Sequence, residues 1–221
     1  MEKLSLKELL ITDLPPAFVR KLMKELDVAY SSASSKVNDD PDIGETEAAY
    51  LLGHYRRSIC ETTFRTLSEE QGLIAKTITP ETGGCRHVQV STSNFNISLC
   101  HVRNPMEFPS FSQARQQNSE INELISQQQL FASEVRSLND KAYVVIVHSE
   151  YSGKPSEFGY ASIGFPNTKF TDWIDQPVDL LDIMDVQALR FQKPEGIQNE
   201  VQHAIPKWKT TKNDDEKKEN A

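Results

Sequence analysis

Residues 142–165 read AYVVIVHSEYSGKPSEFGYASIGF and begin with the longest apolar run of the chain. The run at 142–147 is too short to span a membrane and suits a buried β-strand. Apolar residues return at 158–165, after a turn-forming stretch at 151–155 that contains glycine and proline. We therefore predict a β-hairpin from these two strands.

Two earlier segments, 85–91 and 95–102, alternate apolar and polar residues and predict another hairpin with its turn at 92–94. The apolar faces of both strands must point the same way. The numbers of paired residues must therefore sum to an odd number. A four-residue loop places Val90 opposite Phe95.

A register shifted by two residues places His87 opposite Cys100 instead. In either register Cys85, His87 and Cys100 gather on the polar face of this hairpin. Thiolate sulfur and imidazole nitrogen are zinc ligands, but a zinc ion takes four ligands, or three and a water. The sequence offers no fourth ligand and no C-x-x-C spacing, so we expect no metal and note these three residues as the candidates.

Apolar residues recur every three or four positions in 16–30, 44–71 and 111–131, which predicts three amphipathic helices. A shorter helix is expected over 4–11. The Ser- and Asp-rich stretch 31–43 predicts a mobile loop. On the 44–71 helix, the expected apolar side consists of Ala48, Leu52, Tyr55, Ile59 and Thr63.

Two hairpins separated by one helix favour an antiparallel sheet. We predict an α+β fold with a helical N-terminal half, followed by an antiparallel sheet of about four strands built from the two hairpins. The helices 16–30, 44–71 and 111–131 are expected to cover one face. Residues 1–206 are expected to form a single domain, and the polar, charged segment 207–221 a disordered tail.

The chain has 221 residues, a formal net charge of −8 and three cysteines. An odd cysteine count and an N-terminus without the pattern of a secretory signal favour a reducing, cytoplasmic location. No apolar run approaches the roughly 18 residues of a membrane span, so we expect no membrane partner. The oligomeric state stays open.

Positive charge is concentrated in segment 54–103, which holds six Arg or Lys and four acidic residues. A net negative protein does not bind DNA broadly, because phosphate neutralisation needs clustered cations. A local cationic face on an acidic protein is a narrower hypothesis. It predicts that Arg57, Arg86 and Arg103 form one anion-binding patch.

Histidine as a general base and arginine as a stabilising cation can cleave RNA without a metal. His54 and Arg57 share a helix face, and His87, His101 or Arg86 can approach from the sheet. The Asp…Glu-x-Lys pattern of metal-dependent nucleases is missing from the predicted hairpins, as are phosphate-binding glycine loops. The catalytic candidates are therefore His54, Arg57 and His87, and no cofactor is expected.

The 111–131 helix has an amide-rich face that includes Gln116 and Gln117, and Trp208 in the tail is a candidate docking residue. Since every catalytic pattern is incomplete, the first hypothesis is a non-enzymatic, intracellular regulatory protein that acts through a protein partner. The alternative is a nucleic-acid-directed enzyme, a nuclease or nuclease-like toxin, that uses segment 54–103. An enzyme should gather His, Arg or carboxylates in a pocket between the long helix and the first hairpin, whereas a binding protein should expose an apolar or amide patch.

Overall fold

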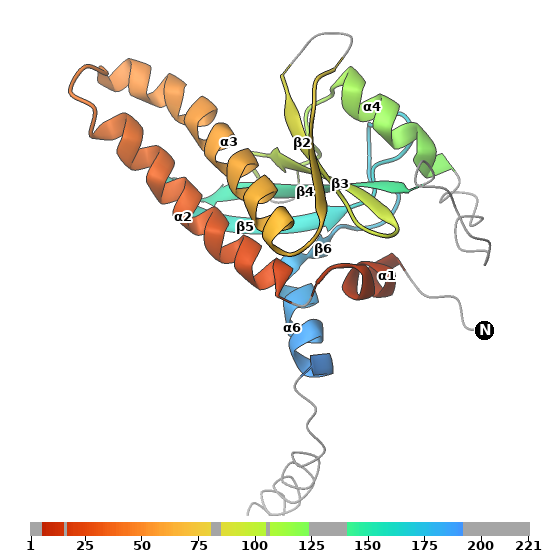
Figure 1. Cartoon of the computed structure of the whole chain (residues 1–221). Coiled ribbons are helices and arrows are strands. Elements are labelled where there is room, and N and C mark those ends of the chain that lie inside the picture. Colours follow the sequence, from red (N-terminus) through yellow and green to blue (C-terminus); the bar gives the residue numbers. More distant parts are fainter. Residues whose placement is uncertain (1–5, 16, 81–84, 105–106, 124–140, 192–221) are drawn as a thin grey trace, which may run out of the picture. The chain divides into compact units, whose positions relative to one another are not determined.

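A computed structural model describes residues 6–15, 17–80, 85–104, 107–123 and 141–191 (Figure 1). The fold is α+β, with helices in the N-terminal half followed by a sheet, as predicted. In chain order the elements are α1 (Leu6–Asp13), α2 (Phe18–Asn38), α3 (Glu45–Glu70), β1 (Ile74–Ile78), β2 (His87–Ser91), β3 (Phe95–His101), α4 (Gln113–Ser119), the 3-10 helix η1 (Glu120–Asn122), β4 (Ala142–Tyr151), β5 (Lys154–Gly164), β6 (Val178–Asp179) and α6 (Leu180–Phe191).

The chain divides into two compact units, Met1–Met184 and Asp185–Ala221. The sheet and both long helices belong to the first unit. The predicted domain end at residue 206 and the predicted tail at 207–221, with Trp208, lie outside the described residues. None of the described helices is both long and apolar enough to cross a membrane.

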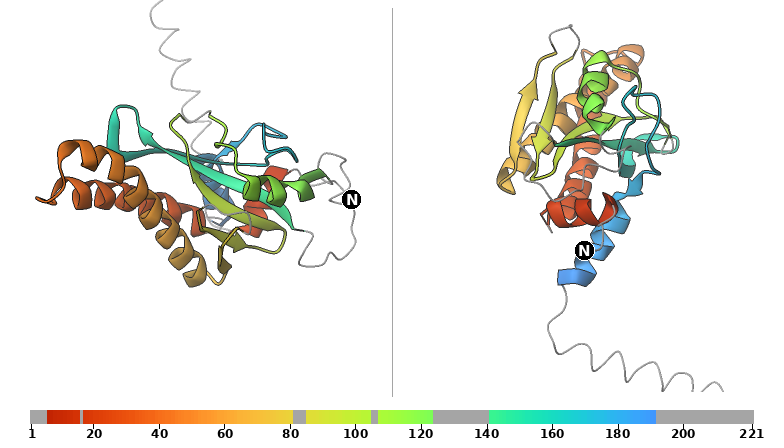
Figure 2. Two further views of the ribbon diagram at one scale, coloured as in Figure 1. Left: turned by 90° about the horizontal axis from the view of Figure 1, so that it is seen from above. Right: turned by 90° about the vertical axis from the view of Figure 1, so that its right-hand side faces the viewer.

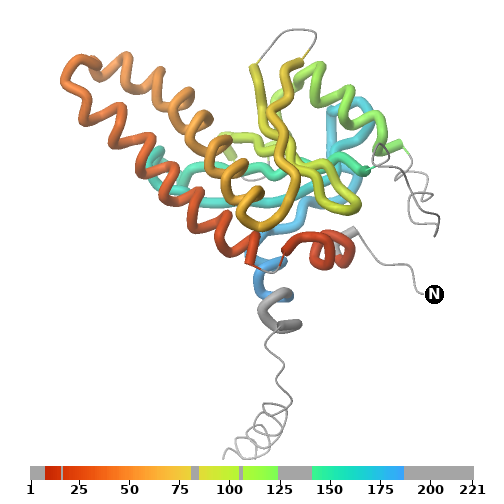
Figure 3. The backbone as a smooth tube through the Cα atoms, in the orientation of Figure 1, coloured from red at the N-terminus to blue at the C-terminus, as the bar shows by residue number. Residues whose placement is uncertain are grey.

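The six strands form one sheet in the order β1-β2-β3-β4-β5-β6. Every neighbouring pair is antiparallel except β3 and β4, which run parallel. Both predicted hairpins are present, but the prediction of an entirely antiparallel sheet is wrong. The connection that contains α4 is long enough to cross over and start β4 at the same end as β3. Figure 3 follows this path from the yellow β1–β3 segment to the teal β4.

The first hairpin adopts the shifted register rather than the one set by a four-residue loop. Val90 pairs with Ile97, two residues beyond Phe95. The backbone N–H of Thr92 donates to the carbonyl of Phe95 at 2.9 Å and closes the turn. Because a shift of two residues keeps each side chain on its face, the predicted apolar face is preserved.

Helices α2 and α3 lie side by side (Figure 2) and pack on one face of the sheet, α2 against β5 and α3 against β1 and β2. Tyr30 of α2 contacts His148, which places that side chain of β4 on the same face. The preceding residue, Val147, packs with Ile121 of η1 on the other face. The prediction that the 111–131 helix joins the other two on one face is therefore wrong for its described part, and residues 124–131 lie outside the described residues.

The predicted loop 31–43 is helical over most of its length, because α2 continues to Asn38. Ala33 and Val37 are buried and extend the four-residue spacing that begins at Ala29. The serines of this stretch lie between these buried positions, so the helix stays amphipathic over its whole length. The turn between the helices is confined to residues 39–44.

The buried face of α3 also differs from the predicted apolar side. Tyr55 is 39% exposed, whereas Arg56, Cys60 and Phe64 are buried. The helix turns a charged residue inward because Arg56 finds a carboxylate partner on β4, Glu150, at 3.1 Å. Paired in this way, a buried guanidinium is tolerated.

Candidate functional site

Strands β2 and β3 diverge and leave a wedge beside α3. They pair with each other only from Gln89–Ser98 to Ser91–Asn96. Beyond that point β2 follows β1 and β3 follows β4. The Glu61 carboxylate of α3 accepts a hydrogen bond from the backbone N–H of Val88 at 2.5 Å, so a side chain replaces the missing ladder bond.

A pocket of about 320 Å³ lies at this wedge, between α3 on one side and β3, β4 and the start of α4 on the other. We call it the α3–β3 pocket. Its volume is in the range of small-molecule binding sites. The α3 wall consists of Tyr50, Gly53, His54, Arg57, Cys60 and Glu61.

His101 and His148 line the sheet side of the pocket. Nε2 of His101 lies 2.6 Å from a carboxylate oxygen of Glu150, which also binds Arg56. Burial raises the pKa of Glu150, but the bond to His101 and the charge of Arg56 outweigh it and hold the pKa below its usual value. The ionised carboxylate can only accept, so Nε2 of His101 carries the proton. Nδ1 is then the basic nitrogen of the neutral ring.

His148 lies behind His101, with the two ring centroids 5.6 Å apart. Burial raises the pKa of Tyr30 far above its usual value, so its hydroxyl stays protonated and donates to Nδ1 of His148 at 2.8 Å. Burial, followed by the charges of His101 and Arg56, lowers the pKa of His148 well below 6.5. His148 is thus a neutral, fixed wall of the pocket.

Burial likewise lowers the pKa of His101 and outweighs the opposing hydrogen bond to Glu150. At neutral pH this ring is unprotonated at Nδ1 and able to accept a proton. A histidine held by a carboxylate is the arrangement that orients general bases in enzymes. His101 is only partly buried, with 27% of its side chain exposed, so solutes in the pocket can reach it.

Two cysteine thiols also line the pocket, those of Cys60 and Cys100. Burial raises the pKa of Cys60 to about 12, and it raises the pKa of Cys100 as well. Both thiols are therefore protonated at neutral pH, and the thiolate is the reactive form. These cysteines serve as apolar lining rather than as nucleophiles.

Two guanidinium groups give the pocket its positive charge. Arg57 enters from α3 and donates to the carbonyl of Arg86 at 2.8 Å, and Arg115 enters from α4 and donates to the carbonyl of Ser110 at 3.3 Å. Among the described residues that line the pocket, Glu61 carries the one carboxylate, and burial raises its pKa. The pocket therefore favours an anionic ligand.

The structure brings together two of the three predicted catalytic residues. His54 and Arg57 line the pocket, whereas His87 is buried outside its lining, with Nε2 lacking a hydrogen-bond partner among the described residues. Arg86 and His87 join Arg57 in the lining of a smaller neighbouring pocket of about 190 Å³. Arg103 is exposed and lines neither pocket.

The three metal-ligand candidates do not form a site. Cys85 is exposed, while His87 and Cys100 are buried. Within the described ranges, no three His, Cys, Asp or Glu side chains gather closely enough to hold a metal ion. On α4, Gln116 is half-buried and Gln117 exposed.

Sequence reasoning did not connect Glu150, Arg56, Tyr30 or Arg115 with the histidines of the pocket. Glu150 lies 49 residues from His101 in the chain, and Tyr30 lies 118 residues from His148. One signal was present, because two apolar strands each end in a histidine. These two residues, His101 and His148, prove to be paired neighbours on parallel strands.

Comparison with known proteins adds no assignment to this geometry. No protein-family model, no curated protein and no solved structure matches the chain. The function is therefore argued from the α3–β3 pocket itself.

Proposed function

We propose that the protein is a nucleic-acid-directed enzyme that cleaves RNA in the α3–β3 pocket by general acid–base chemistry. One observation carries the proposal: a single pocket gathers His54, His101, Arg57 and Arg115. Convergent histidines and arginines between the long helix and the first hairpin are what the sequence argument required of an enzyme. The three free cysteines favour a reducing, cytoplasmic setting for this activity.

The chemistry is attack of a ribose 2′-oxygen on the adjacent phosphorus. The proton of the 2′-hydroxyl passes to Nδ1 of His101, whose other nitrogen is held by Glu150. Arg57 and Arg115 stabilise the negative charge that builds up on the phosphorane. The bond to the 5′-oxygen breaks, and His54 donates a proton to that oxygen as the general acid. The products are a 2′,3′-cyclic phosphate and a 5′-hydroxyl, which balances atoms and protons.

The test is incubation of labelled single-stranded RNA with the full chain at pH 7 in the presence of a metal chelator. We expect fragments that end in a 2′,3′-cyclic phosphate, and no cleavage next to a 2′-deoxyribose. His101→Gln should lower kcat roughly 10²–10⁴-fold, the usual contribution of a general base. Arg57→Gln should lower kcat and raise KM together, because it binds phosphate in both the ground state and the transition state.

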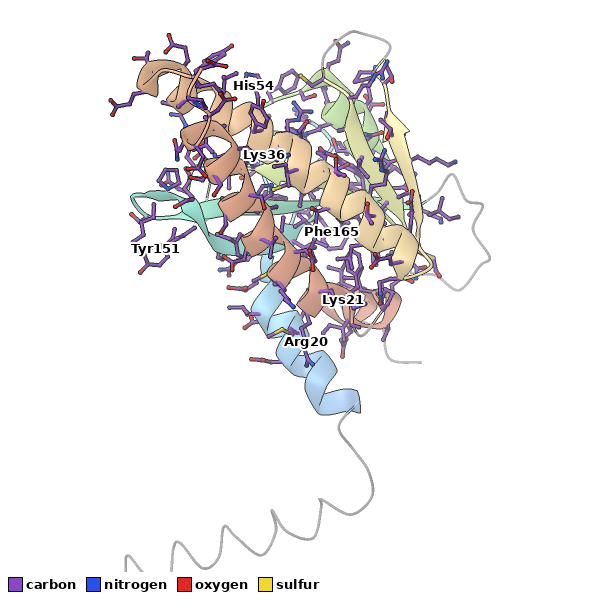
Figure 4. All side chains as sticks on the ribbon, turned by 60° about the vertical axis from the view of Figure 1, so that its left-hand side comes forward. Arg20, Lys21, Lys36, His54, Tyr151 and Phe165 are labelled. Carbon is purple, nitrogen blue, oxygen red and sulfur yellow. The ribbon has the colours of Figure 1, made fainter. Side chains whose placement is uncertain are left out.

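Two matched controls keep the result specific. His87→Gln changes a histidine outside the pocket, and Arg20→Gln changes an exposed arginine on α2. Figure 4 places Arg20 at the far end of the helical layer from His54. Both variants should retain wild-type kcat per folded molecule. Inactive wild-type protein, or equal losses in the His87 and His101 variants, would remove the proposal.

A partner-binding role is the second candidate, supported by exposed side chains beside α4. Phe111 is 66% exposed and Gln117 is exposed on the same segment. The test is affinity capture of the tagged chain with and without nuclease treatment. A defined protein that survives nuclease and is lost in Phe111→Ser favours this role. Co-purified RNA that is lost in Arg57→Ala favours the enzyme.

A further inference from the structure

A glycine interrupts the pocket wall in the interior of α3. Gly53 lies well inside this helix, where glycine is less favourable than alanine. Apart from its chain neighbours and the backbone of its own helix, a Cβ atom built at this position would meet no described atom within 4 Å. Packing within the described residues therefore does not require glycine here. The residue leaves a bare stretch of helix backbone facing the α3–β3 pocket.

An exposed aromatic ring lies one turn before this bare stretch. Tyr50 is 73% exposed, yet it lines the pocket together with Gly53. Residues three and four apart share a helix face, so Tyr50, Gly53 and Arg57 follow one another along the pocket wall. The ring of Tyr50 contacts that of His54, with centroids 5.3 Å apart and an interplanar angle of 54°. This contact supports an aromatic side chain that solvent would otherwise surround.

We propose that this wall is a nucleobase site: the base lies flat on the backbone at Gly53 and stacks on Tyr50, while Arg57 binds the attached phosphate. The inference rests on the proposed function in taking the ligand to be a nucleotide of RNA. Stacking of bases on exposed aromatic side chains is the usual way in which proteins hold single-stranded nucleic acid.

The spacing of the three residues suits one nucleotide. Seven positions separate Tyr50 from Arg57, which is about 10 Å along a helix. The wall thus presents a ring, a flat gap and a cation in that order. A ligand that joins a planar ring to a phosphate through a sugar matches this order, whereas a free phosphate uses the cation alone.

The experiment compares two probes on the full chain by calorimetric titration: uridine 5′-monophosphate and ribose 5-phosphate, which lacks the base. The wild type should bind the nucleotide on the order of tenfold more tightly. Gly53→Ala should abolish this preference by placing a methyl group where the base lies, and Tyr50→Ala should abolish it by removing the stacking partner. Neither variant should change the affinity for ribose 5-phosphate.

The same substitution should raise stability while it lowers nucleotide affinity, and this difference separates a binding role of Gly53 from a structural one. Gly53→Ala should raise the melting temperature by about 2–4 °C, because alanine favours the helix. Thr66→Ala, at an exposed position of α3 outside the pocket, is the matched control and should stabilise without affecting nucleotide binding. Unchanged nucleotide affinity in Gly53→Ala, or equal affinity of the wild type for both probes, overturns the site.

The outcome also separates this inference from the proposed function. Base-dependent binding without RNA cleavage leaves the nucleobase site standing and removes the enzyme. Cleavage of RNA without any base preference does the reverse.

Discussion

The side chains of strand β4 point alternately to its two faces, and these two faces are covered in different ways. On one face Tyr143, Val145 and Val147 pack into a cluster with Phe170. On the other face lies His148, which is hydrogen-bonded to Tyr30 and lines the α3–β3 pocket. The first face is covered by apolar side chains, whereas the second adds a polar network to the buried Val144 and Ile146.

The difference shows that one face of β4 stabilises the fold by apolar packing, whereas the other also positions the polar groups of the pocket. Burying charge is unfavourable unless partners replace the lost water. The polar face meets this requirement in pairs, Arg56 with Glu150, Glu150 with His101, and Tyr30 with His148. The apolar face needs no such pairing. Substitutions on the apolar face should therefore change stability alone, whereas those on the polar face should change stability and activity together.

The largest expected effect is on the apolar face. Phe170 is 1% exposed, and the centroid of its ring lies 5.0 Å from the ring centroid of Phe108. Phe170→Ala should lower the free energy of unfolding by about 3–5 kcal/mol, because it opens a cavity in this cluster. Urea unfolding measures the loss, with Phe111→Ala as an exposed control that should change stability by less than about 0.5 kcal/mol. Activity per folded molecule should not change, and a loss of kcat would break the comparison.

The next effect is on the polar face. Glu150→Gln keeps the shape of the side chain, but it leaves Arg56 without a counter-charge and gives His101 a neutral amide oxygen in place of its carboxylate acceptor. We expect a loss of about 2 kcal/mol, below the usual value for a buried pair because Glu150 is partly exposed. RNA cleavage should also fall at least tenfold, since a neutral amide stabilises the protonated ring of His101 less than a carboxylate does.

The control for that variant is Glu157→Gln, which removes an exposed carboxylate paired with Lys154 at 3.0 Å. An exposed pair contributes about 0–1 kcal/mol, so stability and activity should stay near those of the wild type. Equal stability of the Glu150 and Glu157 variants would show that the polar network does not support the fold.

Much of this architecture follows from local patterns. The apolar run at 142–147 and the periodicity in 44–71 predict β4 and α3, because both signals depend on neighbouring residues. The parallel pairing of β3 with β4 depends on how a long connection crosses the sheet, which no local pattern specifies. The last part of α2 was missed because its many serines match a loop in composition while Ala33 and Val37 keep the helical spacing.

The residues of the site were predictable from the sequence only where they lie on the same helix or strand. His54 and Arg57 were found together because they share a helix face. Glu150 and Arg56 come from different elements, and their pairing depends on the register of the sheet against α3. Arg56 in particular reads as a surface charge in the sequence, since arginine is rarely buried without a partner.

The comparison predicts a pH effect confined to the polar face. The pKa of His148 is well below 6.5 in the folded chain, and those of His101 and His87 are lowered too. Below about pH 6.5 the unfolded chain binds more protons than the folded chain, so stability falls as pH falls. Each such histidine contributes up to about 1.4 kcal/mol per pH unit in its window. Urea unfolding between pH 7.5 and pH 5.5 should show a smaller slope for His148→Gln, and an unchanged slope would contradict the neutral, buried state of this ring.

The smallest expected effect comes from a single oxygen atom at the junction of α2 and β4. Tyr30→Phe keeps the ring, which packs edge-on against Phe158 with centroids 5.7 Å apart, but removes the hydroxyl that donates to His148. The buried Nδ1 then lacks its donor, and we expect a loss of about 1 kcal/mol in the free energy of unfolding. Tyr55→Phe, at a 39% exposed position on α3, should have no comparable effect. If both variants unfold alike, the hydroxyl of Tyr30 does not stabilise His148, and the polar face owes its stability to Arg56 and Glu150 alone.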